Sequence, residues 1–448
     1  MFNYEYLYFN NRLKNRNKLI IFTFPTRTKT TCMNKRFTLP EDWSIVVTGF
    51  LIIALVIFGF PLISPTYGWK STSELTENIF TSYNLKVALH LFICLFVLAI
   101  TLAFFSGKPI KPVLKGFPAV YLLTTFALIL AGNATLKNWN LEAVIFSLLI
   151  GLLIRNFFTV PEWLKASLST EAYVKIGLVL LGTSVIFGDI LKAGSLGLIQ
   201  ALIVVVSVWY FAYWIAKRLG VDEEMSLMIS SAVSICGVSA AIATAGAIKG
   251  DSKKLSYVIS IVLITAIPMI IFMPMLANLL GLPEAVAGAW IGGTIDTSGA
   301  VIASGTLVGE EALKISTIVK FSQNVLLGLA AFAISIYWSY KEKSTETGEK
   351  VKPNVGVIWE RFPKFVIGFI AASLLFSFFI DADTNNAVKG HLKALQGIWF
   401  ALAFTSIGLE TDFRELFKGQ GKKPLYAFLI AQLFNIIVTL LVALLLFS

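Results

Sequence analysis

The sequence predicts an all-α polytopic membrane protein. Of its 448 residues, 56% are hydrophobic and only 14% are charged, whereas soluble domains carry about 25% charged residues. Apolar runs of about 20 residues, the length that crosses a bilayer as a helix, recur along the whole chain. The sequence pattern does not contain the short alternating strands of a membrane barrel, so the predicted spanning elements are helices.

Residues 1–43 form a basic tail before the first apolar run. Residues 1–32 contain neither a long apolar core nor a small-residue cleavage site, so they do not predict a signal peptide. Met33 begins a short basic lead into the first span, and we expect translation to start there. The alternative is that residues 1–32 are a disordered basic tail.

About eleven spans and two atypical segments are expected in order. The first membrane half covers 44–220, and its spans are 44–63, 86–105, 116–132, 141–160, 172–190 and 195–217. The region 221–310 holds two segments rich in small residues, at 227–249 and 286–306, and one span at 257–280. The second half covers 311–448 with a cytoplasmic loop at 341–361, and its spans are 313–340, 362–380, 394–412 and 424–447.

The basic residues of the loops predict the orientation, because Lys and Arg gather on the cytoplasmic side. Four clusters fall on one side if the N-terminus is cytoplasmic and the C-terminus is outside: Lys108, Lys111 and Lys115; Lys217 and Arg218; Lys341, Lys343, Lys350, Lys352, Arg361 and Lys364; and Arg414, Lys418, Lys422 and Lys423. If 227–249 crossed the membrane, Lys249, Lys253 and Lys254 would lie outside. The charge pattern therefore favours a re-entrant segment over a crossing one.

Two pairs of stretches resemble each other within the chain. "GTSVIFGDILKAG" (182–194) matches "GLETDFRELFKGQ" (408–420) in register, and each precedes an apolar span. The predicted topology runs these two stretches in opposite directions, as in the inverted repeats of secondary transporters. "SAAIATAG" (239–246) similarly matches "SGAVIASG" (298–305), so the small-residue stretch occurs once in each atypical segment.

The atypical segments have the composition of discontinuous membrane helices. A helix broken at membrane depth exposes free N–H groups, and its N-terminus carries a partial positive charge that attracts anions. Small side chains let a ligand reach this backbone. The candidate substrate-binding residues are Ser234, Cys236, Gly237 and Ser239 in the first segment, and Thr294, Thr297 and Ser298 after Gly292 and Gly293 in the second. The alternative is that the small residues serve only close helix packing.

Two charged residues stand out at membrane depth. An acid there costs about 2.5–3.5 kcal/mol on insertion scales, so Asp296 is a candidate site for the coupling ion. In "KFSQN", Lys320, Gln323 and Asn324 fall on one helix face and complete the candidate substrate site. Lys320 could neutralise an anion or pair with Asp296. The alternatives are that Asp296 lies in a water-exposed loop and that Lys320 reaches towards the interface from a helix end.

The sequence does not predict an enzyme. It contains no nucleotide-binding loop, no metal-binding cluster and no Ser-His-Asp pattern. The only histidines are His90 and His391, and Cys32, Cys94 and Cys236 have no paired spacing. No cofactor and no metal are therefore expected. The net charge of +11 fits helix orientation better than nucleic-acid binding.

Five motifs resemble, in order, a family of bacterial inner-membrane proteins named as sulfate exporters, of the YeiH type. The motifs are "KIGLVLLGTSVIFGDILKAG", "SICGVSAAIATAGAIKG", "GAWIGGTIDTSGAVIASG", "KFSQN" and "SIGLETDFRELF", and the resemblance as a whole covers about residues 90–447. The motif with Cys236 and Gly237 is the most specific. The resemblance implies inverted repeats, the inner membrane and export of sulfate or related anions. The chain departs from the family where Asp296 or Ile295 replaces a common histidine and Gln323 replaces a common arginine.

The expected function is secondary active transport by alternating access. The substrate is a small anion such as sulfate, exported or exchanged, and Asp296 couples its movement to H⁺ or Na⁺. A monovalent cation/proton antiporter with Asp296 as the carrier is the alternative. The expected partners are the anion, the coupling ion and the lipid bilayer, with no nucleic acid, and by analogy a homodimer.

Overall fold

The computed structural model describes residues 38–60, 62–138, 143–342, 356–414 and 422–448. The chain divides into two compact units, residues 1–37 and 38–448, of which the first lies outside the described residues. Residues 1–37 of the predicted tail 1–43, residues 343–355 of the predicted loop 341–361 and residues 415–420 of the second echo therefore lie outside the described residues.

The described part of the chain is almost entirely helical. Its first half contains α1 (Glu41–Ile57), α2 (Thr72–Glu74), the π-helical turn η1 (Leu75–Ile79), α3 (Ser82–Phe105), α4 (Ile110–Ala131), α5 (Ala134–Asn138), α6 (Ala143–Phe157), α7 (Glu162–Lys165), α8 (Thr170–Gly182) and α9 (Phe187–Arg218). Its second half contains α10 (Glu223–Ser231), η2 (Ala232–Cys236), α11 (Val238–Ile248), α12 (Ser252–Leu279), α13 (Glu284–Thr294), α14 (Ser298–Val308), α15 (Glu310–Glu342), α16 (Gly356–Arg361), α17 (Lys364–Leu374), η3 (Leu375–Phe379), α18 (Ala382–Glu410) and α19 (Lys423–Phe447).

Seven of the described helices are long and apolar enough to cross a membrane, namely α3, α4, α9, α12, α15, α18 and α19. The other predicted spans correspond to shorter helices: α1, α6, α8, and α17 with η3. Several boundaries differ from the sequence prediction, most of all the start of α18, which lies at Ala382 and not at 394. The predicted span 172–190 ends early, because Thr183 and Ser184 form a turn after α8 and α9 already begins at Phe187. Their hydroxyls bond to the carbonyls of Leu180 and Leu181, which helps end the helix.

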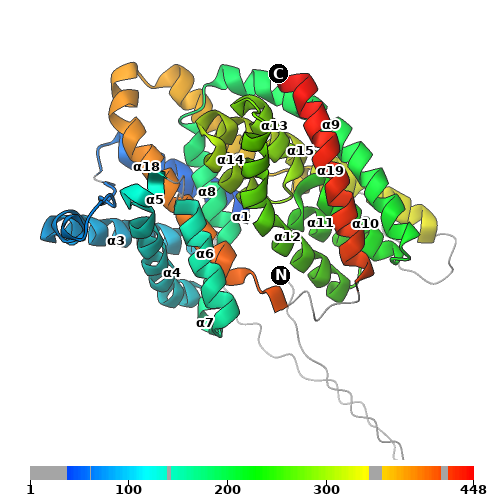
Figure 1. Cartoon of the computed structure of the whole chain (residues 1–448), viewed down its shortest axis with the longest axis horizontal. Coiled ribbons are helices and arrows are strands. Elements are labelled where there is room, and N and C mark those ends of the chain that lie inside the picture. Colours follow the sequence, from blue (N-terminus) through cyan, green and yellow to red (C-terminus); the bar gives the residue numbers. More distant parts are fainter. Residues whose placement is uncertain (1–37, 61, 139–142, 343–355, 415–421) are drawn as a thin grey trace, which may run out of the picture. The chain divides into compact units, whose positions relative to one another are not determined.

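The helices pack as two bundles (Figure 1). We call the first the hairpin bundle, and it consists of α9, α10 to α15 and α19. The second, the flanking bundle, consists of α1, α3, α4, α6, α8, α17 and α18. In Figure 1 the green and red helices of the hairpin bundle lie beside the blue, cyan and orange helices α3, α4, α6 and α18. Both bundles therefore combine helices from the two halves of the chain.

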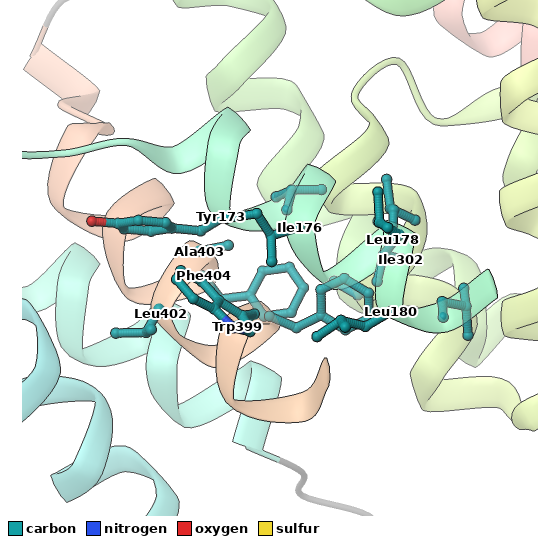
Figure 2. Close-up of a cluster of buried hydrophobic side chains, with 14 of the residues drawn as sticks. Tyr173, Ile176, Leu178, Leu180, Ile302, Trp399, Leu402, Ala403 and Phe404 are labelled. Atoms are coloured by element: carbon teal, nitrogen blue, oxygen red, sulfur yellow. The ribbon is translucent and has the colours of Figure 1, made fainter. Parts of the chain in front are cut away.

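An apolar cluster joins the two bundles (Figure 2). In the flanking bundle, Tyr173 of α8 packs against Trp399 of α18 with ring centroids 5.5 Å apart. Gly177 allows this close approach, since a Cβ there would lie 2.4 Å from the Phe400 ring. Ile302 of α14 lies beside Leu178 of α8, so the hairpin bundle contributes to the same cluster. The contact between the bundles is therefore apolar at this level.

Candidate functional site

The first atypical segment folds back on itself as a helical hairpin, formed by α10 and η2 as one arm and α11 as the other. Its two ends meet, because Lys254 Nζ lies 2.7 Å from Asp222 Oδ1 and 3.3 Å from Glu224 Oε2. The N–H of Asp251 also donates to Glu224 Oε2 at 3.2 Å. The chain thus returns to the side where it entered, as the lysines at 249, 253 and 254 indicated.

The second atypical segment forms a hairpin of the same kind from α13 and α14. Its base is closed by Glu284, whose Oε2 accepts from the N–H groups of Glu311 and Ala312 at 3.1 and 3.4 Å. The 28-residue helix α12 joins the end of the first hairpin to the start of the second, and 28 residues rise by about 42 Å. The bases of the two hairpins therefore lie at opposite ends of α12.

The tips of the two hairpins touch at Gly237. This residue separates η2 from α11 with φ 58° and ψ −111°, in the left-handed region that glycine tolerates. A Cβ at Gly237 would lie 3.2 Å from both Cβ and the carbonyl oxygen of Asp296, and 2.7 Å from Val262 Cγ1. Glycine is therefore required both by the backbone and by the approach of the second tip.

The predicted polar face of α15 lies against both tips. Lys320 Nζ donates to the Ile235 carbonyl at 2.8 Å and to Gln323 Oε1 at 2.9 Å. Gln323 Nε2 donates to the Gly293 carbonyl at 2.9 Å, and Asn324 Nδ2 to Ser298 Oγ at 3.3 Å. The contacts to Ile235 and Gly293 supply donors to carbonyls that the helix breaks leave free.

Burial decides between the alternatives for the two charged residues. Lys320 is only 2% exposed, so the alternative of a helix-end lysine at the interface is wrong. Asp296 is only 1% exposed, so the alternative of a water-exposed loop is wrong as well. Its Oδ2 has no hydrogen-bond partner among the described residues. The expected Asp296–Lys320 pair is not formed within 4 Å in the described part of the chain, where Lys320 binds Ile235 and Gln323 instead.

The sequence prediction missed three amides that hold the tips from α9 and α19. Asn435 Nδ2 donates to the carbonyls of Val233 and Thr294 at 3.1 and 3.2 Å, and thereby joins both hairpins. Gln432 Nε2 donates to the Thr294 carbonyl at 2.9 Å, and Gln200 Nε2 to the Ala289 carbonyl at 2.7 Å. The sequence contained a signal for two of these amides, because Gln432 and Asn435 recur with Thr439 at helical spacing in a very apolar helix, where polar residues are costly.

A cavity of about 530 Å³ extends from the tips to the edge of the flanking bundle. The N-terminal ends of α11 and α14 reach it. Of the predicted site residues, those that line it are Cys236, Ser239, Thr297, Ser298 and Asn324. The remaining predicted residues lie behind this wall, and these are Ser234, Gly237, Thr294, Asp296, Lys320 and Gln323. Ser234, for example, donates to the Ser230 carbonyl at 2.7 Å within its own helix.

The other end of the cavity, which we call the mouth, is lined by charged residues. They are Asp42 at the start of α1, Glu171 and Lys175 of α8, Glu360 of α16 and Glu410 at the end of α18. Lys175 Nζ pairs with Asp42 at 2.9 Å and with Glu171 at 3.3 Å. Asp42 also accepts the N–H of Lys364 at 3.0 Å. Two of the four mouth acids are thus tied to Lys175.

Comparison with known proteins shows the family of this chain. The family model described as conserved hypothetical protein 698 matches residues 115–428. The chain belongs to this family. A UPF0324 membrane protein of Rhodopirellula baltica is 40% identical over 76% of this chain and 64% of its own length. One of Nitratidesulfovibrio vulgaris is 38% identical over 84% of this chain and 66% of its own length, and one of Nitrosomonas europaea is 27% identical over 86% and 91%.

The chain therefore spans about two thirds of the length of the two more similar relatives. No solved structure matches it. In this member of the conserved hypothetical protein 698 family, Asp296 and Gln323, the positions at which the sequence is expected to depart from the resembling motifs, both lie at the tips. Asp296 lies beside the backbone turn at Gly237, and Gln323 holds the carbonyl of Gly293. The two expected departures therefore fall in the same small region.

Proposed function

We propose that this chain is a secondary active transporter that exports or exchanges a small anion such as sulfate by alternating access. The observation that carries the proposal is the meeting of two oppositely inserted hairpins at Gly237 and Asp296, beside a cavity. Broken helices at membrane depth are costly unless they serve a site, because their backbone groups need partners. Transporters place substrate sites at such breaks.

The anion would bind at the deep end of the cavity. There the N-termini of α11 and α14 supply N–H groups and partial positive charge, and the hydroxyls of Ser239, Thr297 and Ser298 supply further donors. Lys320 would act from behind the first tip, through the Ile235 carbonyl that it holds. It would thus add positive charge without touching the anion.

Asp296 would couple transport to H⁺ or Na⁺. Its carboxylate is buried at the tips, and Oδ2 is without a partner among the residues described. An ionised carboxylate there would repel an incoming anion, whereas a protonated or Na⁺-bound one would not. Occupancy of Asp296 would therefore change the affinity for the anion, which is the linkage that coupling requires.

Two observations support an inverted repeat. The echoes at 239–246 and 298–305 fall on the second arms of the two hairpins, α11 and α14. The echo at 182–194 spans the turn between α8 and α9, and the described part of the echo at 408–420 begins at the end of α18; the next spans, α9 and α19, pack against each other in the hairpin bundle. In an inverted repeat, these motifs would hold equivalent places in two oppositely inserted units.

The proposal includes the bacterial inner membrane, with the N-terminus cytoplasmic and the C-terminus outside. The four basic clusters that fall on one side of the predicted topology support this orientation, and the mouth of the cavity would then open towards the cytoplasm. The chain would bind no cofactor and catalyse no reaction, and a homodimer is its proposed assembly. The two more similar relatives are longer than the part of them that this chain matches, so the proposal concerns the two described bundles and not the full length of those relatives.

Sulfate flux in proteoliposomes, measured with and without a pH gradient, tests the proposal. Gly237→Leu should abolish flux, because the side chain would collide with Val262 and Asp296 at a backbone angle that leucine avoids. Asp296→Asn should keep residual flux but lose its pH dependence. Gly390→Ala, where a Cβ meets no atom within 4 Å, should behave as the wild type. Absence of sulfate flux in monodisperse wild-type protein would refute the sulfate assignment.

A monovalent cation/proton antiporter is the second candidate. It is favoured by the buried Asp296 with its unpartnered oxygen, since a carboxylate is a natural carrier for H⁺ or Na⁺. Sodium-driven or potassium-driven proton movement in the same vesicles, lost completely in Asp296→Asn, would support this candidate. An anion carrier would show no such exchange.

A further inference from the structure

We propose that this transporter selects a small oxyanion that carries an O–H group, such as hydrogen phosphate, over an oxyanion without a proton, such as sulfate. Asn324 would accept the hydrogen bond from this O–H group at the deep end of the cavity. The inference rests on the proposed transport of an anion and specifies its substrate class. It follows from the donors and acceptors that Thr297, Ser298 and Asn324 present to the cavity.

Hydrogen bonds, and not ion pairs, would recognise the solute at the deep end. Among the described residues that line the cavity, the only basic one is Lys175, which lies at the mouth and pairs with Asp42 and Glu171. Lys320 is buried behind the first tip, where it binds the Ile235 carbonyl. Where no basic side chain touches the solute, the pattern of hydrogen-bond donors and acceptors decides which oxyanion fits.

Two hydroxyl groups at the start of α14 already accept a hydrogen bond. Thr297 Oγ1 accepts from the N–H of Ala300 at 3.3 Å, and Ser298 Oγ accepts from Asn324 Nδ2 at 3.3 Å. Each hydroxyl keeps its own proton to donate. Because both residues line the cavity, these protons and the N-terminal N–H groups of α14 suit the oxygens of an anion.

Asn324 presents the opposite kind of group to the same end of the cavity. It lines the cavity and is only 5% exposed, and its Oδ1 has no hydrogen-bond partner in the described part of the chain. Because its Nδ2 donates to Ser298, Oδ1 is the atom of the amide that is left for the solute. An amide oxygen only accepts hydrogen bonds. It therefore disfavours a deprotonated oxygen of an anion and favours an O–H group.

Together, these groups match a protonated oxyanion. Water can donate to Asn324 Oδ1 while the cavity is hydrated, but a solute that displaces this water has to supply the donor itself. Sulfate carries no proton, so it would leave Oδ1 unsatisfied and place a negative oxygen beside it. Hydrogen phosphate has the same tetrahedral shape and the same charge, but one of its oxygens is protonated. It would accept from Thr297 and Ser298 and donate to Asn324.

Three tetrahedral dianions of nearly equal size test this inference, namely hydrogen phosphate, sulfate and monofluorophosphate. At alkaline pH they carry the same charge, and only hydrogen phosphate has an O–H group. We would measure uptake of radiolabelled phosphate and radiolabelled sulfate into proteoliposomes at such a pH, and inhibition of both by the three unlabelled dianions. Hydrogen phosphate should inhibit at concentrations about tenfold or more below those of the other two, as one satisfied buried acceptor predicts.

Two variants locate the selecting contact. Asn324→Leu replaces the amide by a branched side chain without an acceptor, and it should weaken hydrogen phosphate to the level of sulfate. Ser239→Ala removes a hydroxyl that lines the cavity from α11, so it should weaken the three dianions alike and leave their ratio unchanged. Asn386→Leu is the matched control, because it makes the same change at an exposed position of α18 that does not line the cavity.

The outcomes separate this inference from the proposed function. If sulfate or monofluorophosphate inhibits as well as hydrogen phosphate in the wild type, the selection is refuted while anion transport stands, and the amide would then face the solute with Nδ2. An unchanged preference in monodisperse Asn324→Leu protein would also refute the role of Asn324. If this variant does not fold, the wild-type series decides by itself. Uptake of neither labelled anion by the monodisperse full chain would overturn the proposed function itself.

Discussion

At the scale of single residues, the broken helices depend on amide side chains. Each hairpin ends its first arm with carbonyls that no helix turn satisfies, and Asn435, Gln432 and Gln323 donate to them. An unsatisfied buried carbonyl costs about 1–3 kcal/mol, so these donors are required to hold the tips together. Asn435 has a special position, because it is shared by both hairpins.

Asn435→Leu should therefore destabilise the protein markedly. It removes the donor to the carbonyls of Val233 and Thr294, and we expect a loss of about 1–3 kcal/mol in the free energy of unfolding. Thermal unfolding in detergent would detect it as a lower midpoint.

Ile437→Leu on the same helix is the control, because Ile437 is 52% exposed and keeps its volume in this change. An Asn435→Leu protein as stable as the control would show that water replaces the amide, and the assigned role of Asn435 would be wrong.

At the scale of elements, the second hairpin depends on small residues along α13. Gly288 and Gly292 are four residues apart and face α15. A Cβ would lie 2.7 Å from the Ala312 carbonyl at the first position and 2.5 Å from the Ser316 carbonyl at the second. Small residues at this spacing let membrane helices approach closely. Close packing therefore explains Gly288 and Gly292, whereas the site interpretation of the small residues at the tips stays a prediction.

Gly288→Leu should prevent α13 from packing on α15, because the contact atoms belong to backbone that cannot move aside. We expect a strong loss of monodisperse protein in size-exclusion chromatography. Gly390→Ala in α18 is the matched control and should be neutral or stabilising by up to about 1 kcal/mol, since alanine favours a helix over glycine. Normal yield of Gly288→Leu would mean that the two helices are not closely packed in solution.

At the scale of the whole described unit, the hairpin bundle meets the flanking bundle through an apolar contact at the wall of the cavity. Gly299 of α14 approaches Ile407 of α18 and Val174 of α8. A Cβ at Gly299 would lie 3.0 Å from Ile407 Cδ1 and 3.5 Å from Val174 Cγ2. All three residues line the cavity, and Ile302 and Leu178 continue the contact (Figure 2). Apolar surfaces without directional bonds can separate or slide, so this contact is suited to close one side during alternating access.

Gly299→Leu should block movement between the bundles while leaving the fold intact. Its side chain would wedge against Ile407 and Val174, which are flexible side chains rather than backbone. We expect solute flux to fall by about tenfold or more, whereas the thermal midpoint in detergent changes little. Gly299→Ala should retain most of the flux. Normal flux in Gly299→Leu would show that the bundles do not move against each other at this contact.

The sequence by itself determined the class of protein and the two unusual segments. Composition and apolar run length predicted membrane helices, because the bilayer fixes both. Small residues, the glycine at 237 and the acid at 296 marked the breaks, because few residues tolerate such positions. The lysines at 249, 253 and 254 indicated a hairpin, because charge placement depends on topology.

The tertiary structure decided which side chains meet. A pair between Lys320 and Asp296 was one of the possibilities that the sequence left open, but Lys320 binds the Ile235 carbonyl and Gln323, since free backbone carbonyls at a break compete for donors. The sequence did not point to Gln200, and the helical spacing of the polar residues around Asn435 did not tell which carbonyls Asn435 would bind, because both residues come from helices far away in the chain. The sequence also did not predict that Glu410 and Lys175 line the same cavity as residues of the hairpin tips. Such contacts depend on how the two bundles pack, and local sequence patterns carry no information on distances across a bundle.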